Sequence, residues 1–116
     1  MNSMTLEQAR AKFAWNSVQG CTDAYAKFAK GAPALIMNNG LMQSLAFFHE
    51  KEHHELERHL RSWLAVRVAE LHGANDFPAL MAKLLNAKPA SYRQATEEAL
   101  LLLRWIRQFA GALGGQ

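Results

Sequence analysis

The stretch SYRQATEEALLLLRWIRQFAGAL, residues 91–113, is the longest uninterrupted helical pattern in the chain. On a helical wheel of about 100° per residue, its apolar residues form one broad arc: Ala95, Ala99, Leu102, Leu103, Ile106, Phe109, Ala110 and Leu113. Arg93, Arg104 and Arg107 lie together on the opposite side, and Leu101 and Trp105 lie between the two arcs. The stretch therefore predicts one helix with a core face, a basic face and a flank suited to contact with another protein.

The rest of the chain is also predicted to be helical. With 116 residues, half of them hydrophobic, it has room for one core, so we expect a single domain over residues 1–116. Good helix formers are common, whereas β-branched residues are scarce and there are only three prolines. No alternating apolar pattern between hairpin turns is present. These features predict an all-α protein, a compact bundle of about five helices.

Capping residues and helix breakers divide the first ninety residues into four predicted helices. The ranges are a first helix from a cap at Ser3 or Thr5 to Lys30, a second over 34–48, a third from His49 or His53 to His72, and a fourth over 77–85 behind an Asp76 cap. Gly31-Ala32-Pro33 is expected to end the first of these, and residues 86–90 to link the fourth to the last helix, with Ser91 as its cap.

Two glycines leave alternatives open. Gly20 lies among small residues of the first predicted helix, which favours close packing against a neighbouring helix over a hinge. Asn38-Asn39-Gly40 is a turn-like triplet inside the second predicted helix. Either that helix tolerates Gly40 or it breaks there.

The sequence predicts a cytoplasmic protein that does not enter a membrane. Cys21 is the only cysteine, so it cannot form an internal disulfide and a reducing compartment is expected. The first residues mix acids and bases before any long apolar run, unlike a secretory signal. No stretch approaches the roughly 20 apolar residues that a membrane span needs.

One motif resembles a zinc-protease site. His49-Glu50-Lys51-Glu52-His53 fits H-E-x-x-H, and His59 occupies the place of a third ligand. Leu56 replaces the glycine that would turn the chain, and on a continuous helix His59 would lie roughly 9 Å along the axis from His53. We therefore predict no metal, and we expect His49 and His53 to border the apolar stripe. The role of His49, His53, His54 and His59 stays open.

Other signatures of catalysis are missing from the sequence. There is no glycine-rich phosphate loop, no G-x-S-x-G and no cysteine motif with a histidine nearby. Cys21 stands among small residues and is expected to pack. Glu97 and Glu98 diverge by about 100° on a helix, so they do not form a carboxylate pair and are expected to serve solubility beside the arginines. We predict a protein that is not an enzyme and uses no cofactor.

Charge is unevenly distributed along the chain. Residues 49–59 carry four acids and two bases, a local balance of −2 that leaves +5 for the rest. Lys27 and Lys30, at the end of the first predicted helix, are candidates for contact with an anionic partner, although lysines there also offset the helix dipole.

The basic face of the last helix is the stronger anion-binding feature. Arg93, Arg104 and Arg107 lie within about 60° of one another and span about 21 Å. Guanidinium groups fork onto phosphate oxygens, so this row can follow several phosphates of a nucleic acid. An ordinary solvated face is the alternative.

The last helix also carries residues that resemble a known family. Its pattern Y-R-x-x-T-x-E-x-L-x-x-L-x-W-I-R-x-F-A, from Tyr92 to Ala110, is similar to the C-terminal signature of the small subunit of the type III-B CRISPR effector, the Cmr complex. The Asn39-Gly40-Leu41 segment, with Gln43 and Ala46-Phe47 after it, and an early helix with Arg10 look similar too. Gln108 departs from the pattern, which often has a second arginine there.

The resemblance implies a small all-helical subunit without catalytic activity. Several copies of such subunits stack as an inner filament along guide RNA and target RNA, beside other Cmr-complex subunits, in antiviral defence. On this basis the RNA-binding candidates are Arg93, Arg104, Arg107, Lys27, Lys30 and Arg10, and the subunit-interface candidates are Leu101 and Trp105. The alternative is a helical protein–protein adaptor without nucleic-acid contact.

Overall fold

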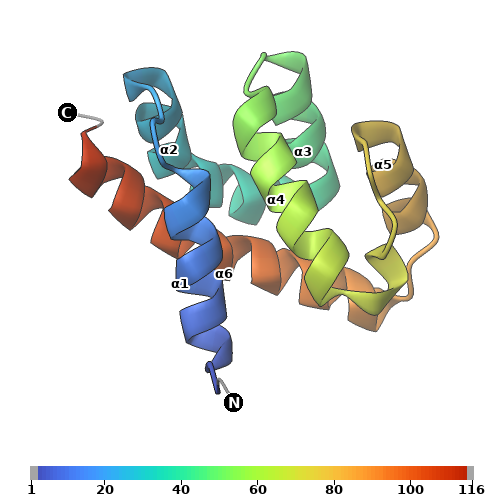
Figure 1. The fold of residues 1–116 in the computed structure, drawn as a ribbon. Helices are drawn as coiled ribbons and strands as arrows, with labels where there is room; N and C mark the ends of the chain where they lie inside the picture. The colour runs from blue at the N-terminus through green and yellow to red at the C-terminus, as the bar shows by residue number, and fades with distance from the viewer. Residues whose placement is uncertain (1–2, 115–116) are drawn as a thin grey trace.

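The computed structural model describes residues 3–114, which form six α-helices and one short 3-10 turn (Figure 1). The helices are α1 (Leu6–Ser17), α2 (Asp23–Asn39), α3 (Leu41–Glu50), α4 (His54–Arg67), α5 (Phe77–Leu85) and α6 (Pro89–Leu113), and the 3-10 turn η1 (Ala69–Leu71) precedes α5. No strand occurs in this range, so the all-α prediction is confirmed, with six helices in one globule where about five were expected. The single-domain boundaries 1–116 stay a prediction.

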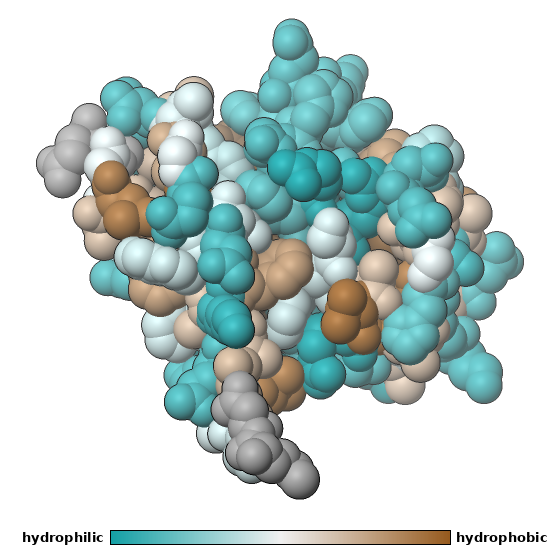
Figure 2. All heavy atoms as spheres, viewed as in Figure 1, coloured by the Kyte–Doolittle hydropathy of each residue, from teal (hydrophilic) through white to brown (hydrophobic). Residues whose placement is uncertain are grey.

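Helix α6 is the helix against which most of the others pack. It runs along one side of the molecule, α1 crosses it, and α2 and α4 pack against it (Figure 1). Most of its predicted apolar arc is buried, namely Ala95, Ala99, Leu102, Leu103, Ile106 and Ala110. Phe109 is half-buried and Leu113 is exposed, so the arc loses its cover toward the C-terminal end. In the view of Figure 2, hydrophobic residues form only isolated spots on a hydrophilic surface.

The first predicted helix is in fact two helices. Thr5 caps α1 as predicted, because its hydroxyl accepts a hydrogen bond from the Gln8 N–H at 3.0 Å. The chain then turns at Gly20, whose φ of 71° lies in the left-handed region. A Cβ at Gly20 would meet no atom within 4 Å, so the prediction of close packing there is wrong. Thr22 caps α2 by accepting a hydrogen bond from the Tyr25 N–H.

Helix α2 continues where a stop was predicted. Gly31-Ala32-Pro33 lies inside it, and the predicted end at Lys30 is wrong. Ala29, Ala32 and Ile36 are buried on one face of α2, and this packing maintains the helix although Pro33 lacks an N–H. The helix ends at Gly40, with φ of 87°, so the break at Asn38-Asn39-Gly40 is the alternative that is confirmed.

The ends of the remaining helices also differ in part from prediction. Between α3 and α4 the chain turns through Glu52, whose φ is 64°, and α4 ends at Arg67 before η1 instead of reaching His72. Helix α5 has the predicted range, and the Asp76 carboxylate caps it by accepting from the Ala79 N–H at 2.8 Å. Helix α6 begins at Pro89 and not at Ser91, because a proline suits the first helical position, where no N–H partner is required.

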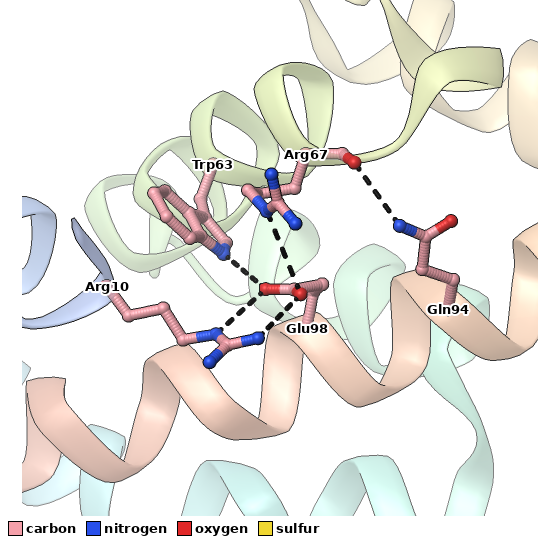
Figure 3. A network of polar contacts seen from close by, with 5 residues as sticks. All are labelled: Arg10, Trp63, Arg67, Gln94 and Glu98. Atoms are coloured by element: carbon pink, nitrogen blue, oxygen red, sulfur yellow. Dashed lines mark hydrogen bonds and ion pairs between the residues drawn. The ribbon is translucent and has the colours of Figure 1, made fainter. Parts of the chain in front are cut away.

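A buried carboxylate joins α1 and α4 to α6 (Figure 3). Arg10 of α1 donates to Glu98 through both arms of its guanidinium, from Nε to Oε1 at 3.1 Å and from Nη2 to Oε2 at 2.8 Å. Trp63 of α4 donates its indole N–H to Oε1 at 2.9 Å, and Arg67 places Nε 3.8 Å from Oε2. Glu98 is only 5% exposed, so these partners take the place of water around its charge.

The expected surface position of Glu98 is therefore wrong. Glu98 follows Ala95 by three residues and precedes Leu102 by four, which is the spacing of the buried stripe itself. This spacing was the available signal, but the partner Arg10 lies 88 residues away in the sequence. Charge alone suggested solvent exposure.

We expect the substitution Glu98→Gln to lower the free energy of unfolding by about 3 kcal/mol, because it leaves two partly buried guanidinium groups without their carboxylate. Glu97→Gln is the matched control, since Glu97 is the exposed neighbour, and it should change stability by less than about 0.5 kcal/mol. Urea unfolding of both variants measures this difference. Equal effects of the two substitutions would contradict a structural role for Glu98.

Candidate nucleic-acid interface

The arginine face of α6 consists of Arg93, Arg104 and Arg107, and all three side chains are exposed. They lie on the side of α6 opposite its buried stripe, where no other helix covers them. Within residues 3–114, none of the three has a carboxylate oxygen within the 4.0 Å of an ion pair. Their charges are therefore free for an anionic partner.

Two neighbouring hollows border this face. One, of about 420 Å³, lies between α1 and α6 and is lined by Glu7, Arg10, Leu101, Arg104, Trp105 and Gln108. The other, of about 300 Å³, is lined by Lys30, Arg107, Gln108, Gly111 and Ala112. Gln108 lines both, so the hollows are neighbours on this surface. The fold thus brings Lys30 of α2 beside Arg107 and joins Arg104 to the predicted flank of Leu101 and Trp105.

The other three predicted RNA-binding residues are less suited to a shared site than Arg104, Arg107 and Lys30; they are Arg10, Lys27 and Arg93. Arg10 is at the wall of the first hollow, but its side chain is only 14% exposed and Glu98 holds its guanidinium, which raises the pKa of Arg10. Arg10 therefore forms a structural ion pair with Glu98. Lys27 is exposed one turn before Lys30, and Arg93 lies about 16 Å along α6 from Arg104. Both extend the charged surface beyond the hollows.

An aromatic row extends from the first hollow, where Trp105 lines it; we define the row as Trp15, Phe109 and Trp105. The ring centroids of Trp105 and Phe109 are 5.4 Å apart, and Trp15 of α1 meets Phe109 edge-on at 5.1 Å. Trp105 and Phe109 are half-buried, whereas Trp15 is 44% exposed. Sequence reasoning missed Trp15, because only the crossing of α1 over α6 brings it to this surface.

His49, His53 and His54 lie away from α6, around the turn between α3 and α4. His49 stacks on Phe77 of α5 with centroids 4.3 Å apart, and His53 stacks on Phe28 of α2 at 3.5 Å. The two histidines are on opposite sides of the turn, so the continuous helix assumed for the H-E-x-x-H motif is wrong. Within residues 3–114, no three His, Cys, Asp or Glu side chains are grouped as metal ligands would be.

His59 belongs to a separate hollow of about 360 Å³ beside this turn. It is buried, and its Nδ1 is 2.8 Å from the Tyr25 hydroxyl. Burial and the neighbouring Arg58 lower the pKa of His59, so the imidazole is neutral at neutral pH and its Nδ1 shares a hydrogen bond with the Tyr25 hydroxyl. The half-buried Cys21 and the stacked His53 also line this hollow. Its neutral and acidic lining contrasts with the arginine face.

Glu57 is a second buried acid, and its surroundings differ from those of Glu98. Its carboxylate is 3.6 Å from Arg61 Nη1 and 3.8 Å from His49 Nδ1, too far for hydrogen bonds. Burial raises the pKa of Glu57 although the positive charge of Arg61 acts to lower it. For Glu98, burial also acts to raise the pKa, but the hydrogen bonds from Arg10 and Trp63 outweigh it, so the pKa of Glu98 is lowered.

The two acids should give stability opposite dependences on pH. The lowered pKa of Glu98 gives a contribution that is present above the unfolded value of about 4.3 and is lost as pH falls through the folded pKa. The raised pKa of Glu57 gives a contribution that is present below that value and is lost as pH rises through the folded pKa.

We therefore expect Glu57→Gln to stabilise the protein at pH 7, by about 1 kcal/mol, because no buried charge has to be maintained. The gain over the wild type should disappear as pH falls toward 4, whereas the loss caused by Glu98→Gln should shrink only below about pH 4.3, as pH falls through the folded pKa of Glu98. Denaturant unfolding at a series of pH values measures both. A loss of stability on Glu57→Gln at pH 7 would mean that its ion pairs outweigh its burial.

The chain matches the family model described as CRISPR-associated protein (Cas_Cmr5) over residues 6–113. The matched range extends from the first residue of α1 to the last residue of α6. It therefore includes all six helices of residues 3–114, the arginine face and the aromatic row. The family that the sequence resemblance indicated is confirmed. Within residues 3–114, no helix combines the length and apolar character needed to cross a membrane.

Proposed function

The chain belongs to the Cas_Cmr5 family, the small subunit of the type III-B CRISPR Cmr complex, and on this premise we propose how it acts there. It is a non-catalytic subunit that stacks in several copies along guide and target RNA in antiviral defence. It contacts the RNA backbone through basic side chains. The observation that supports this best is the arginine face, three exposed guanidinium groups in a row on the uncovered side of α6.

Phosphate contact is the chemistry that this row performs best. A guanidinium group presents parallel N–H donors that match two phosphate oxygens, and it stays charged at any physiological pH. The row spans about 21 Å, which is long enough to follow several phosphates. Lys30 beside Arg107, and Lys27 one turn earlier, extend the positive surface onto α2.

The geometry supports a division of labour within the complex. The arginine face reads charge and backbone shape, while base pairing with the guide supplies sequence specificity, as in other RNA-guided systems. The partners are guide RNA, target RNA, other Cmr-complex subunits and copies of this chain, in the cytoplasm. Exposed apolar side chains on other helices, Met37, Val66 and Leu85, are available for contact with those proteins.

Charge reversal tests the proposal. Arg104→Glu combined with Arg107→Glu should weaken RNA association of the assembled complex at least tenfold at low salt, since each reversal removes a phosphate contact and adds repulsion. The slope of log affinity against log salt should also become shallower. Filter binding of complexes reconstituted with the variant subunit measures both quantities.

Lys51→Glu is the matched control, because Lys51 is an exposed cation at the turn between α3 and α4, far from α6 (Figure 1). It should leave RNA affinity unchanged. Thermal unfolding of the isolated subunits checks that the reversed side chains, which are all exposed, do not unfold the protein. If the double reversal leaves affinity and its salt dependence as in the wild type, the arginine face does not contact RNA.

The alternative function is a helical adaptor that binds only proteins. The exposed apolar side chains of α2, α4 and α5 favour it to the same degree as they favour subunit contact within a ribonucleoprotein. The two functions differ in whether binding depends on RNA. Adaptor binding would survive nuclease and high salt and would give no protein–RNA crosslinks to α6.

A further inference from the structure

We propose that the aromatic row beside the arginine face stacks on unpaired bases, so that this surface prefers single-stranded RNA to duplex RNA. The inference rests on the proposed function, because it refines which form of RNA the same surface takes. It adds Trp15, Phe109 and Trp105 to a site that was defined so far by charge alone.

The three rings form one continuous surface feature across two helices. Phe109 lies in the middle, 5.4 Å from Trp105 at an interplanar angle of 34° and 5.1 Å from Trp15 at 86°. Trp15 is 44% exposed at the outer end, on α1. Because Phe109 and Trp105 are partly buried against the core, they hold the outer indole at a fixed place. A held ring loses little conformational entropy when a base stacks on it.

The row is directly connected to the cationic surface. Trp105 lines the hollow between α1 and α6 together with Arg104 and Gln108. A strand whose phosphates follow the arginines can therefore turn its bases toward the rings. The Gln108 amide also offers a donor and an acceptor to a base edge.

The combination of rings and cations selects for unpaired nucleotides. Proteins that bind single strands pair a positive groove with aromatic side chains, because every unpaired base has a free π-face. In an A-form duplex the bases are stacked on one another and offer only their edges. Phosphate contacts alone would not distinguish the two forms, so the rings would provide the preference.

Trp63 shows a contrasting use of the same residue type in this protein. It is 5% exposed, and its indole N–H is bonded to Glu98. Trp15 is far more exposed, and within residues 3–114 no protein group accepts a hydrogen bond from its N–H. Trp63 serves the core, whereas Trp15 presents its ring at the surface.

The test compares binding of a short single-stranded RNA and a blunt RNA duplex of the same length by the full-length protein at low salt, followed by fluorescence anisotropy. Trp15→Ala should weaken single-strand binding about tenfold, the usual effect of losing one base-stacking ring, and leave duplex binding unchanged. Trp15→Phe keeps a ring at the position and should restore most of the single-strand affinity.

Phe47→Ala is the matched control, because Phe47 is an exposed aromatic residue of α3, at 39%, and lines neither hollow beside α6. It should bind both RNAs as the wild type does. Thermal unfolding separates any loss of stability from a loss of binding, and the Trp15→Phe variant keeps the test valid if Trp15→Ala folds poorly.

The outcomes distinguish this inference from the proposed function. If Trp15→Ala binds both RNAs as the wild type does, or loses both equally, the stacking role is wrong while the arginine face stands. The same holds if the wild type binds neither RNA, or if Trp15→Ala instead releases a neighbouring subunit, as expected for a protein interface at Trp105. Failure of the proposed function would be seen in a separate experiment, as unchanged RNA affinity after charge reversal at Arg104 and Arg107 in the assembled complex.

Discussion

The carboxylate of Glu98 receives hydrogen bonds from Arg10 of α1 and Trp63 of α4, so one side chain of α6 fixes two other helices against it. The position of α1 matters most for the surface, because α1 forms one wall of the hollow beside Arg104 and carries Trp15. A buried acid therefore determines where the exposed cations and rings lie relative to each other. It also engages Arg10, which is therefore less available to a partner than the exposed arginines of α6.

Helices α6 and α5 could be predicted from the sequence because the sequence patterns that define them are local. A stripe of three- and four-residue spacing from Ala95 to Ala110 determines which side of α6 is buried, and the opposite side carries the arginines as expected. Asp76 and Pro78 mark the start of α5 unambiguously. The exposure of Arg93, Arg104 and Arg107 follows from the same periodicity, so this part of the candidate site was accessible without coordinates.

The remaining features depend on contacts between distant segments. The chain turns at Gly20, after the end of α1, whereas it stays helical through Gly31, because α2 buries Ala29 and Ala32 on either side of Gly31. Similarly, the role of Trp15 depends on its ring contact with Phe109, ninety-four positions further along the chain, and the role of Glu98 depends on its hydrogen bonds from Arg10. No local pattern encodes such pairs. The sequence resemblance identified the family correctly, but it could not separate a structural arginine from one available to RNA.

The unequal distribution of charge has a consequence for how the subunit approaches a polyanion. Exposed acids at the turn between α3 and α4, including Glu50 and Glu52, lie at the end of the molecule away from α6 (Figure 1). In the field of the proposed RNA partner, the net charge of +3 would favour approach, and the field would exert a torque on the separated charges of the subunit. That torque would rotate α6 toward the RNA over roughly a Debye length of 8–10 Å, before any atom touches. Orientation would thus be selected during diffusion, and fewer encounters would begin with the wrong face.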